Sequence, residues 1–213
     1  MDIDLLGNVL FAMVRTGTPL LLVALGELVC EKSGVLNLGQ EGMMLFGAVI
    51  SFMVAFSTGS LWLGVLFAIL AGMLLASLFA AVALGLNANQ VACGLALTIF
   101  GVGLSSFVGA AWVGKPLQGF APLALPWLAQ LPVLGKMLFA QDALVYLSFA
   151  LFAGVAWLLL KSRAGLVIQA VGENPDAAAA MGLPVLRVRL LAVLFGGAMA
   201  GLAGAYLSLA YTP

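Results

Sequence analysis

The chain has very few charged side chains. Only 8% of its 213 residues are Asp, Glu, Lys or Arg, whereas soluble domains carry about 25%. Hydrophobic residues make up 64% of the chain, and the mean hydropathy is +1.22. So few charges cannot cover a globule that faces water. The composition therefore excludes an ordinary soluble domain and predicts a polytopic membrane protein, an all-α transmembrane helical bundle.

Further absences exclude several functions. The chain has no histidine, which removes Ser-His hydrolysis and most zinc sites. It also lacks a GxSxG nucleophile motif and the GxxxxGK[ST] loop that binds ATP phosphates. The formal net charge is zero, so nothing in the charge balance favours nucleic acid. Cys30 and Cys93 do not have metal-ligand spacing and are interpreted as packing residues. We therefore expect no enzyme, no metal site and no cofactor in this chain.

Six stretches are apolar enough to cross a bilayer, which takes about 20 residues. The first stretch begins with residues 18–30, and the other five are 42–57, 60–86, 90–112, 142–160 and 187–210. Residues 5–14 end at Arg15 and predict a separate interfacial amphipathic helix. Residues 114–141 contain Pro116, Pro122, Pro126 and Pro132. These prolines disfavour a straight helix and predict a structured extramembrane or re-entrant loop.

The distribution of basic residues predicts the orientation. Lys161, Arg163, Arg187 and Arg189 flank the polar segment 161–186, and Lys and Arg concentrate in cytoplasmic loops. That segment is therefore predicted to be cytoplasmic. Counting spans then places the N-terminus and the proline-rich loop outside, and the polar connections before the second and fourth spans inside.

The segment 161–186 predicts one short helix at 175–181. Asn174 is a good N-cap, Pro175 suits the first helical position, and Gly182 can end the helix. A helix of two turns is not stable alone in water. Either its own membrane domain supports it or a soluble partner binds it, and both alternatives remain open.

Polar residues interrupt the apolar pattern before the second and fourth spans. Broken helices at membrane depth are tolerated where they line a cavity, and amides both donate and accept hydrogen bonds. We therefore predict a path for an uncharged, hydroxylated solute, bordered by Asn37, Gln40, Glu41, Asn89 and Gln90. The alternative is a plain cytoplasmic loop, which is the preferred interpretation for Glu27, Glu31 and Lys32.

The run GGAMAGLAGA at 196–205 places Gly197 and Gly201 four residues apart, followed by Gly204. Small residues let helix backbones approach closely in lipid. They predict tight packing within the chain or, alternatively, a subunit interface.

Three stretches resemble a known family. AVGENPDAAAAMGLPV (170–185) is similar to the cytoplasmic coupling segment of bacterial ABC-transporter permeases related to branched-chain amino acid and simple-sugar importers. GELVCEKSGVLNLGQEGMMLFGA (26–48) resembles the N-terminal signature of the nucleoside and simple-sugar branch. NANQVACGLALTIFGVGLSSFVG (87–109) resembles the next signature of that branch, in the second of its two paired permeases.

The resemblance implies a multi-pass permease subunit of an ATP-driven importer for nucleosides or simple sugars, in the inner membrane of a bacterial cell. It implies an ABC ATPase that uses the ATP, a second permease and an extracytoplasmic substrate-binding protein as partners, besides the lipid bilayer. Family members are longer and have further spans. Residues 1–213 would then be one permease domain that is C-terminally incomplete or shortened, with 161–186 as its coupling loop. The implied ATPase-coupling residues are Gly172, Asn174, Pro175, Ala178, Ala179 and Gly182.

A competing hypothesis is a stand-alone secondary transporter or channel for a small uncharged solute. Ion coupling would require titratable groups inside the membrane, and the sequence offers few beyond Glu41. A neighbouring gene for an ATPase would favour the importer.

Overall fold

A computed structural model describes residues 3–123 and 140–211, and the regular structure of these residues is entirely helical. Six of the described helices are long and apolar enough to cross a membrane. They are α1 (Ile3–Lys32), α2 (Gln40–Thr58), α3 (Leu61–Ala80), α4 (Gln90–Gly109), α6 (Ala143–Lys161) and α9 (Val185–Tyr206). Short helical turns of other types prolong three of them, namely the π-helices η1 (Ala81–Gly85) and η3 (Leu207–Tyr211) and the 3-10 helix η2 (Ala110–Trp112). The chain is therefore a multi-pass membrane protein, and the prediction of an all-α bundle with six spans is confirmed.

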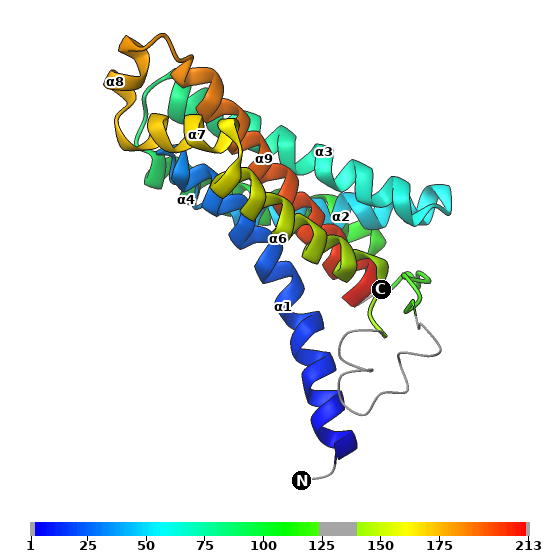
Figure 1. Cartoon of the computed structure of the whole chain (residues 1–213). Coiled ribbons are helices and arrows are strands. Elements are labelled where there is room, and N and C mark those ends of the chain that lie inside the picture. Colours follow the sequence, from blue (N-terminus) through cyan, green and yellow to red (C-terminus); the bar gives the residue numbers. More distant parts are fainter. Residues whose placement is uncertain (1–2, 124–139, 212–213) are drawn as a thin grey trace.

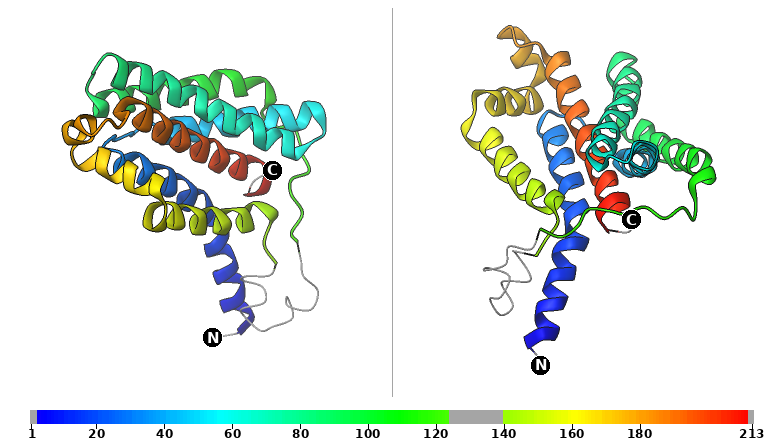
Figure 2. Two further views of the ribbon diagram at one scale, coloured as in Figure 1. Left: turned by 45° about the horizontal axis from the view of Figure 1, so that its top comes forward. Right: turned by 90° about the vertical axis from the view of Figure 1, so that its right-hand side faces the viewer.

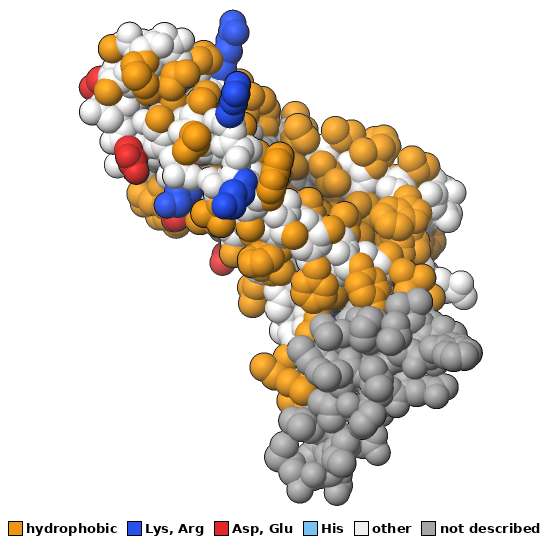
Figure 3. Space-filling view, in the orientation of Figure 1, with side chains coloured by type: hydrophobic (Ala, Val, Ile, Leu, Met, Phe, Trp, Pro, Cys, Tyr) orange, Lys and Arg blue, Asp and Glu red, His pale blue; other side chains and the backbone are white. Residues whose placement is uncertain are grey.

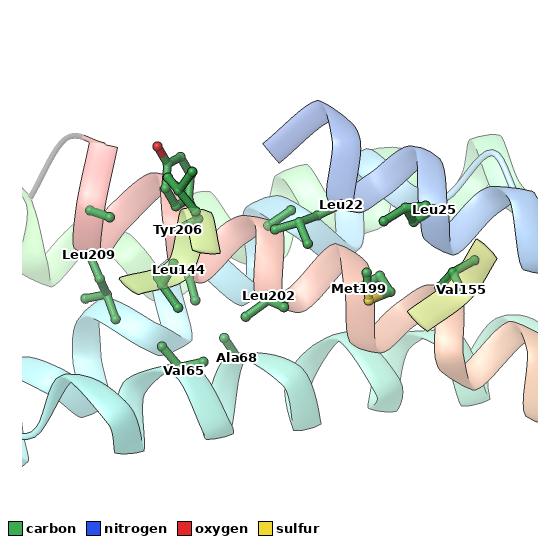
Figure 4. Close-up of a cluster of buried hydrophobic side chains, with 14 of the residues drawn as sticks. Leu22, Leu25, Val65, Ala68, Leu144, Val155, Met199, Leu202, Tyr206 and Leu209 are labelled. Carbon is green, nitrogen blue, oxygen red and sulfur yellow. The ribbon is translucent and has the colours of Figure 1, made fainter. Parts of the chain in front are cut away.

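Helix α9 lies at the centre of the bundle. It contacts α3 and α2 on one side and α1 on the other, and α6 packs beside α1 (Figures 1 and 2). Figure 4 shows the core that joins these helices, with Leu144 of α6 between Tyr206 of α9 and Val65 of α3, and with Leu22 of α1 in the same cluster. Helix α4 packs mainly on α2 and lies at the edge of the bundle.

Glycines let α9 approach its neighbours closely. A side chain at Gly201 would overlap the carbonyl oxygen of Ala68 in α3, and one at Gly204 would overlap that of Met44 in α2. A Cβ on Gly197 would lie 2.5 Å from the carbonyl oxygen of Gly72. The small residues of the GGAMAGLAGA run are therefore used for packing within the chain.

The prediction of a separate interfacial helix at 5–14 is wrong. Helix α1 is continuous from Ile3 to Lys32 with Pro19 inside it, and at about 1.5 Å per residue its 30 residues span about 45 Å. Arg15 does not end the helix because other segments neutralise and bind it. Its guanidinium lies 3.5 Å from the Asp142 carboxylate, donates to the Ala210 carbonyl, and contacts the Tyr211 ring.

Two short helices, α7 (Arg163–Glu173) and α8 (Pro175–Ala180), connect α6 to α9 at one end of the bundle. Figure 3 shows basic side chains gathered at this end, above a largely hydrophobic surface. The described parts of the proline-rich loop begin after η2 and end before α6, at the opposite end of the bundle. Most of it, residues 124–139, lies outside the described residues, while residues 113–123 follow an irregular path without helix.

Candidate functional site

The connection between α1 and α2 is folded around the carboxylate of Glu27. The two oxygens of Glu27 accept hydrogen bonds from the backbone N–H of Asn37, at 2.9 Å, and from Nε2 of Gln40, at 3.0 Å. Oδ1 of Asn37 in turn accepts from the backbone N–H of Gly39. Asn37 and Gln40 are only 1% and 5% exposed. The connection is therefore a packed, hydrogen-bonded turn, which we call the polar turn (residues 33–39).

Helix α4 closes the other side of the polar turn. Oε1 of Gln90 accepts a hydrogen bond from the backbone N–H of Leu36 at 2.9 Å, and Thr98 donates to the carbonyl of Leu38. Asn89 caps α4 by accepting from the backbone N–H of Ala92. The beginning of α4 is thereby attached to the backbone of the polar turn.

The structure brings three of the five predicted path residues together. Asn37, Gln40 and Gln90 surround the polar turn, whereas Glu41 and Asn89 are exposed at its edge. Nδ2 of Asn37 and Oε1 of Gln40 are buried without a hydrogen-bond partner among the described residues. A role of these residues in a substrate path stays a prediction.

Sequence reasoning missed Glu27, which was interpreted as a solvated charge of a loop. The structure contradicts that interpretation, since Glu27 is part of α1 and half-buried. One signal could have found it. Glu27 lies inside the apolar run LLLVALGELVC, one helical turn before Glu31, so a carboxylate there needs hydrogen-bond partners.

The segment 161–186 is more helical than predicted. The short helix and its N-cap are confirmed, as Oδ1 of Asn174 accepts from the backbone N–H of Ala177 at 2.9 Å and Pro175 takes the first position. Gly182 has a φ of +82°, a conformation that glycine adopts without strain. Helix α7 before it was not predicted. Its amphipathic residues pack on α6, α9 and α1.

Helix α8 has an inner and an outer face. Ala178 is 2% exposed and is covered by its own chain, whereas Met181 is 73% exposed. Ala177, Ala179 and Ala180 are exposed as well. Any partner that approaches α8 meets this outer face, so Ala179 is available for contact and Ala178 is not.

Helix α7 rests on the end of α1 next to the polar turn. A side chain at Gly172 would overlap the carbonyl oxygen of Lys32, and its own Cα lies close to Gly34, which has a φ of +79°. Arg189 of α9 donates from Nε to the carbonyl of Ser33 at 3.2 Å. The segment 161–186 is therefore in backbone contact with the polar turn.

A cavity of about 740 Å³ lies toward the opposite end of the bundle, between the second halves of α2 and α4. It is lined by Phe52, Ser105, Ser106, Trp112, Lys115 and Ser208 together with small residues. Its volume falls in the range of about 300–1,000 Å³ that is typical of small-molecule sites. No motif in the sequence pointed to it, because its walls come from four separate segments.

The same end of the bundle carries the Arg15–Asp142 ion pair. Asp142 precedes α6 and is 2% exposed. Burial raises the pKa of its carboxyl group, and the Arg15 guanidinium offsets this only in part. The pair joins the middle of α1 to the start of α6.

These features together define a class of protein: a multi-pass membrane protein with a cavity toward one end and a short capped helix projecting at the other. The family model described as "Branched-chain amino acid transport system / permease component" matches residues 9–212. The chain belongs to this family of permease components.

Three relatives are similar over nearly the whole chain. A putative glucose ABC transporter permease of Haloferax volcanii, TsgC13, is 45% identical over 96% of this chain and 64% of its own length. The guanosine ABC transporter permease NupQ of Bacillus subtilis is 34% identical over 96% of this chain and 68% of its own length. The nucleoside ABC transporter permease NupC of Lactococcus lactis is 32% identical over 91% of this chain and 64% of its own length.

The chain therefore spans about two thirds of the length of these curated relatives. No solved structure matches it.

Proposed function

We propose that the chain forms the membrane-spanning permease part of an ATP-driven importer for nucleosides or simple sugars. The observation that carries the proposal is the placement of α8. This helix is capped by Asn174, projects at the end where the basic residues gather, and presents exposed Ala179 and Met181. A helix this short is not stable alone in water. A soluble partner that packs on its outer face would stabilise it and could transmit movement to the bundle through it.

The partners follow from that role. An ABC ATPase binds the outer face of α8 and hydrolyses the ATP, because the chain has no P-loop of its own. A second permease completes the pathway, and an extracytoplasmic binding protein delivers the solute. The end with α7 and α8 faces the cytoplasm of a bacterial cell, across its inner membrane. In this orientation the cavity opens on the outer half of the bilayer.

The coupling follows a chain of contacts. Movement of α8 passes to α7, and the contact of Gly172 with the Lys32 carbonyl transfers it to the end of α1. The polar turn lies at that point, held by Glu27 and by Gln90 of α4. A displacement of α7 therefore shifts the inner end of α4 relative to α2. This is where we place the inner gate, with Asn37 and Gln40 at its edge.

The test is uptake by proteoliposomes that contain the chain together with an ABC ATPase, a second permease and an extracytoplasmic binding protein of the same system. Uptake of labelled uridine or glucose is expected only with ATP and the ATPase present. Uptake by the chain alone, driven by a proton or sodium gradient, would contradict the proposal and identify a secondary transporter. That competing function has one observation in its favour, the half-buried titratable Glu27 in α1.

A further inference from the structure

The lining of the outer cavity favours one of the two solute classes in the proposed function. Two aromatic rings form part of its wall, Phe52 of α2 and Trp112 of η2. Phe56 packs behind both, with ring centroids 6.0 Å from Phe52 and 5.5 Å from Trp112. The three rings contact one another and form one apolar surface. A planar ring that enters the cavity can stack on it.

The serine hydroxyls of the cavity present acceptors. Ser105 and Ser106 both donate to the carbonyl of Val102 at 2.9 Å. Ser51 donates to Ala48, so in the 2.6 Å contact between Ser51 and Ser208 the proton comes from Ser208. A hydroxyl has one proton and two lone pairs. With the protons used, the hydroxyls of the lining offer lone pairs to a solute that carries donors.

Donors come from another part of the lining. Lys115 lies with Nζ 4.1 Å from the centroid of the Trp112 ring, which holds the ammonium group at the cavity. This single cation in the described lining can donate to a carbonyl or ring nitrogen. It is too little to neutralise a phosphorylated solute. The cavity therefore suits an uncharged molecule with hydroxyl donors, acceptors and a flat ring.

Close helix contacts shut the cavity toward the cytoplasm. A Cβ on Gly42 of α2 would lie 2.8 Å from the carbonyl oxygen of Leu97, and one on Gly101 of α4 would lie 2.6 Å from the Cα of Gly42. The two backbones therefore touch between the cavity and the polar turn. A solute in the cavity stays on the outer side of this contact until the helices separate.

We propose that the outer cavity is a nucleoside site, in which Phe52 stacks on the base while Ser105 and Ser106 accept from the sugar hydroxyls. The inference rests on the proposed function and narrows its solute from nucleosides or simple sugars to nucleosides. A hexose can place only a C–H face on the aromatic wall, whereas a planar base can stack on it with its whole ring. Stacking on an aromatic side chain contributes about 1–3 kcal/mol per base, so loss of the ring is expected to weaken nucleoside binding by about fivefold or more.

The experiment measures binding of tritiated uridine to the assembled importer in nanodiscs, with unlabelled glucose as competitor. Phe52→Leu removes the ring and is expected to weaken uridine binding about tenfold, and Ser106→Ala about fivefold. The matched controls lie on the exposed surface of α3. They are Phe67→Leu and Ser77→Ala, the latter losing a local hydrogen bond to the Leu74 carbonyl like that of Ser106 to the Val102 carbonyl. Both controls are expected to bind like the wild type.

The outcomes separate the two proposals. Uridine affinity that is unchanged in both cavity variants, or glucose that competes as well as uridine, overturns the assignment of the cavity. If such a complex still imports with ATP, the proposed function stands. Loss of affinity in the cavity variants with no ATP-dependent import would instead support the nucleoside site and contradict the importer.

Discussion

Met181 offers a direct test of the outer face of α8 as the contact for an ATPase. The side chain is 73% exposed at the end of the helix, an unusual position for a large apolar group in water. Burying a methionine completely contributes about 1.5–3 kcal/mol. If the partner covers the exposed part, Met181→Ala removes about 1–2 kcal/mol of binding free energy, which corresponds to a Kd raised about 5- to 30-fold.

The assay is binding of the purified ATPase to the chain in nanodiscs, followed by biolayer interferometry. Met13→Ala is the matched control, because Met13 is 62% exposed in the first half of α1, away from the end of α1 on which α7 rests. The control is expected to bind like the wild type. Ala178→Glu is less informative, since Ala178 is covered by its own chain and a charge there would displace α8 itself. An unchanged Kd in Met181→Ala would refute the assignment of this face.

Three other outcomes test the two ends of the bundle. Glu27→Leu removes the acceptor of the Asn37 backbone N–H and of Nε2 of Gln40, which costs about 1–3 kcal/mol for each buried donor. The Tm of this variant is therefore expected to fall well below that of the exposed control Glu31→Leu. Equal Tm values would contradict the role of Glu27. In a cysteine-free background, a polar thiol reagent is expected to label Glu41→Cys and to spare Asn37→Cys, which is 1% exposed in the native turn; rapid labelling at 37 would show that the turn opens. Because burial raises the pKa of Asp142 above its unfolded value, its contribution to stability is present at low pH and is lost as pH rises through the folded pKa. The Tm of the wild type relative to Asp142→Asn is therefore expected to rise as pH falls, and a constant difference would contradict this.

The number of spans could be predicted from hydropathy, and the cap of α8 from the order Asn174-Pro175. Both depend on neighbours in sequence, where propensity and capping act. The continuity of α1 could not be predicted, because the groups that bind the Arg15 guanidinium are the Asp142 carboxylate and the Ala210 carbonyl. Both lie more than a hundred residues away in the sequence.

Of the two candidate sites, the polar turn could be predicted in part from the sequence and the outer cavity could not. The polar turn was visible as a group of amides and glycines, but the carboxylate that orders it belongs to the preceding helix. Glu27 lies ten residues before Asn37 and reaches it only because the chain reverses at the polar turn. The outer cavity required three-dimensional information, since Phe52, Ser105 and Ser208 come from different spans and resemble ordinary apolar or packing residues when taken singly.

The glycine contacts of α9 determine which parts of the bundle can move. Gly197, Gly201 and Gly204 place its backbone directly against α2 and α3, where sliding would drive carbonyl groups into one another. These helices therefore behave as one rigid body. Helix α4 touches that body mainly through α2, and its close contact with α2 at Gly42 and Gly101 lies between the cavity and the polar turn. In the proposed importer, α4 would therefore have to move away from α2 at this contact before a solute could pass from the cavity to the polar turn.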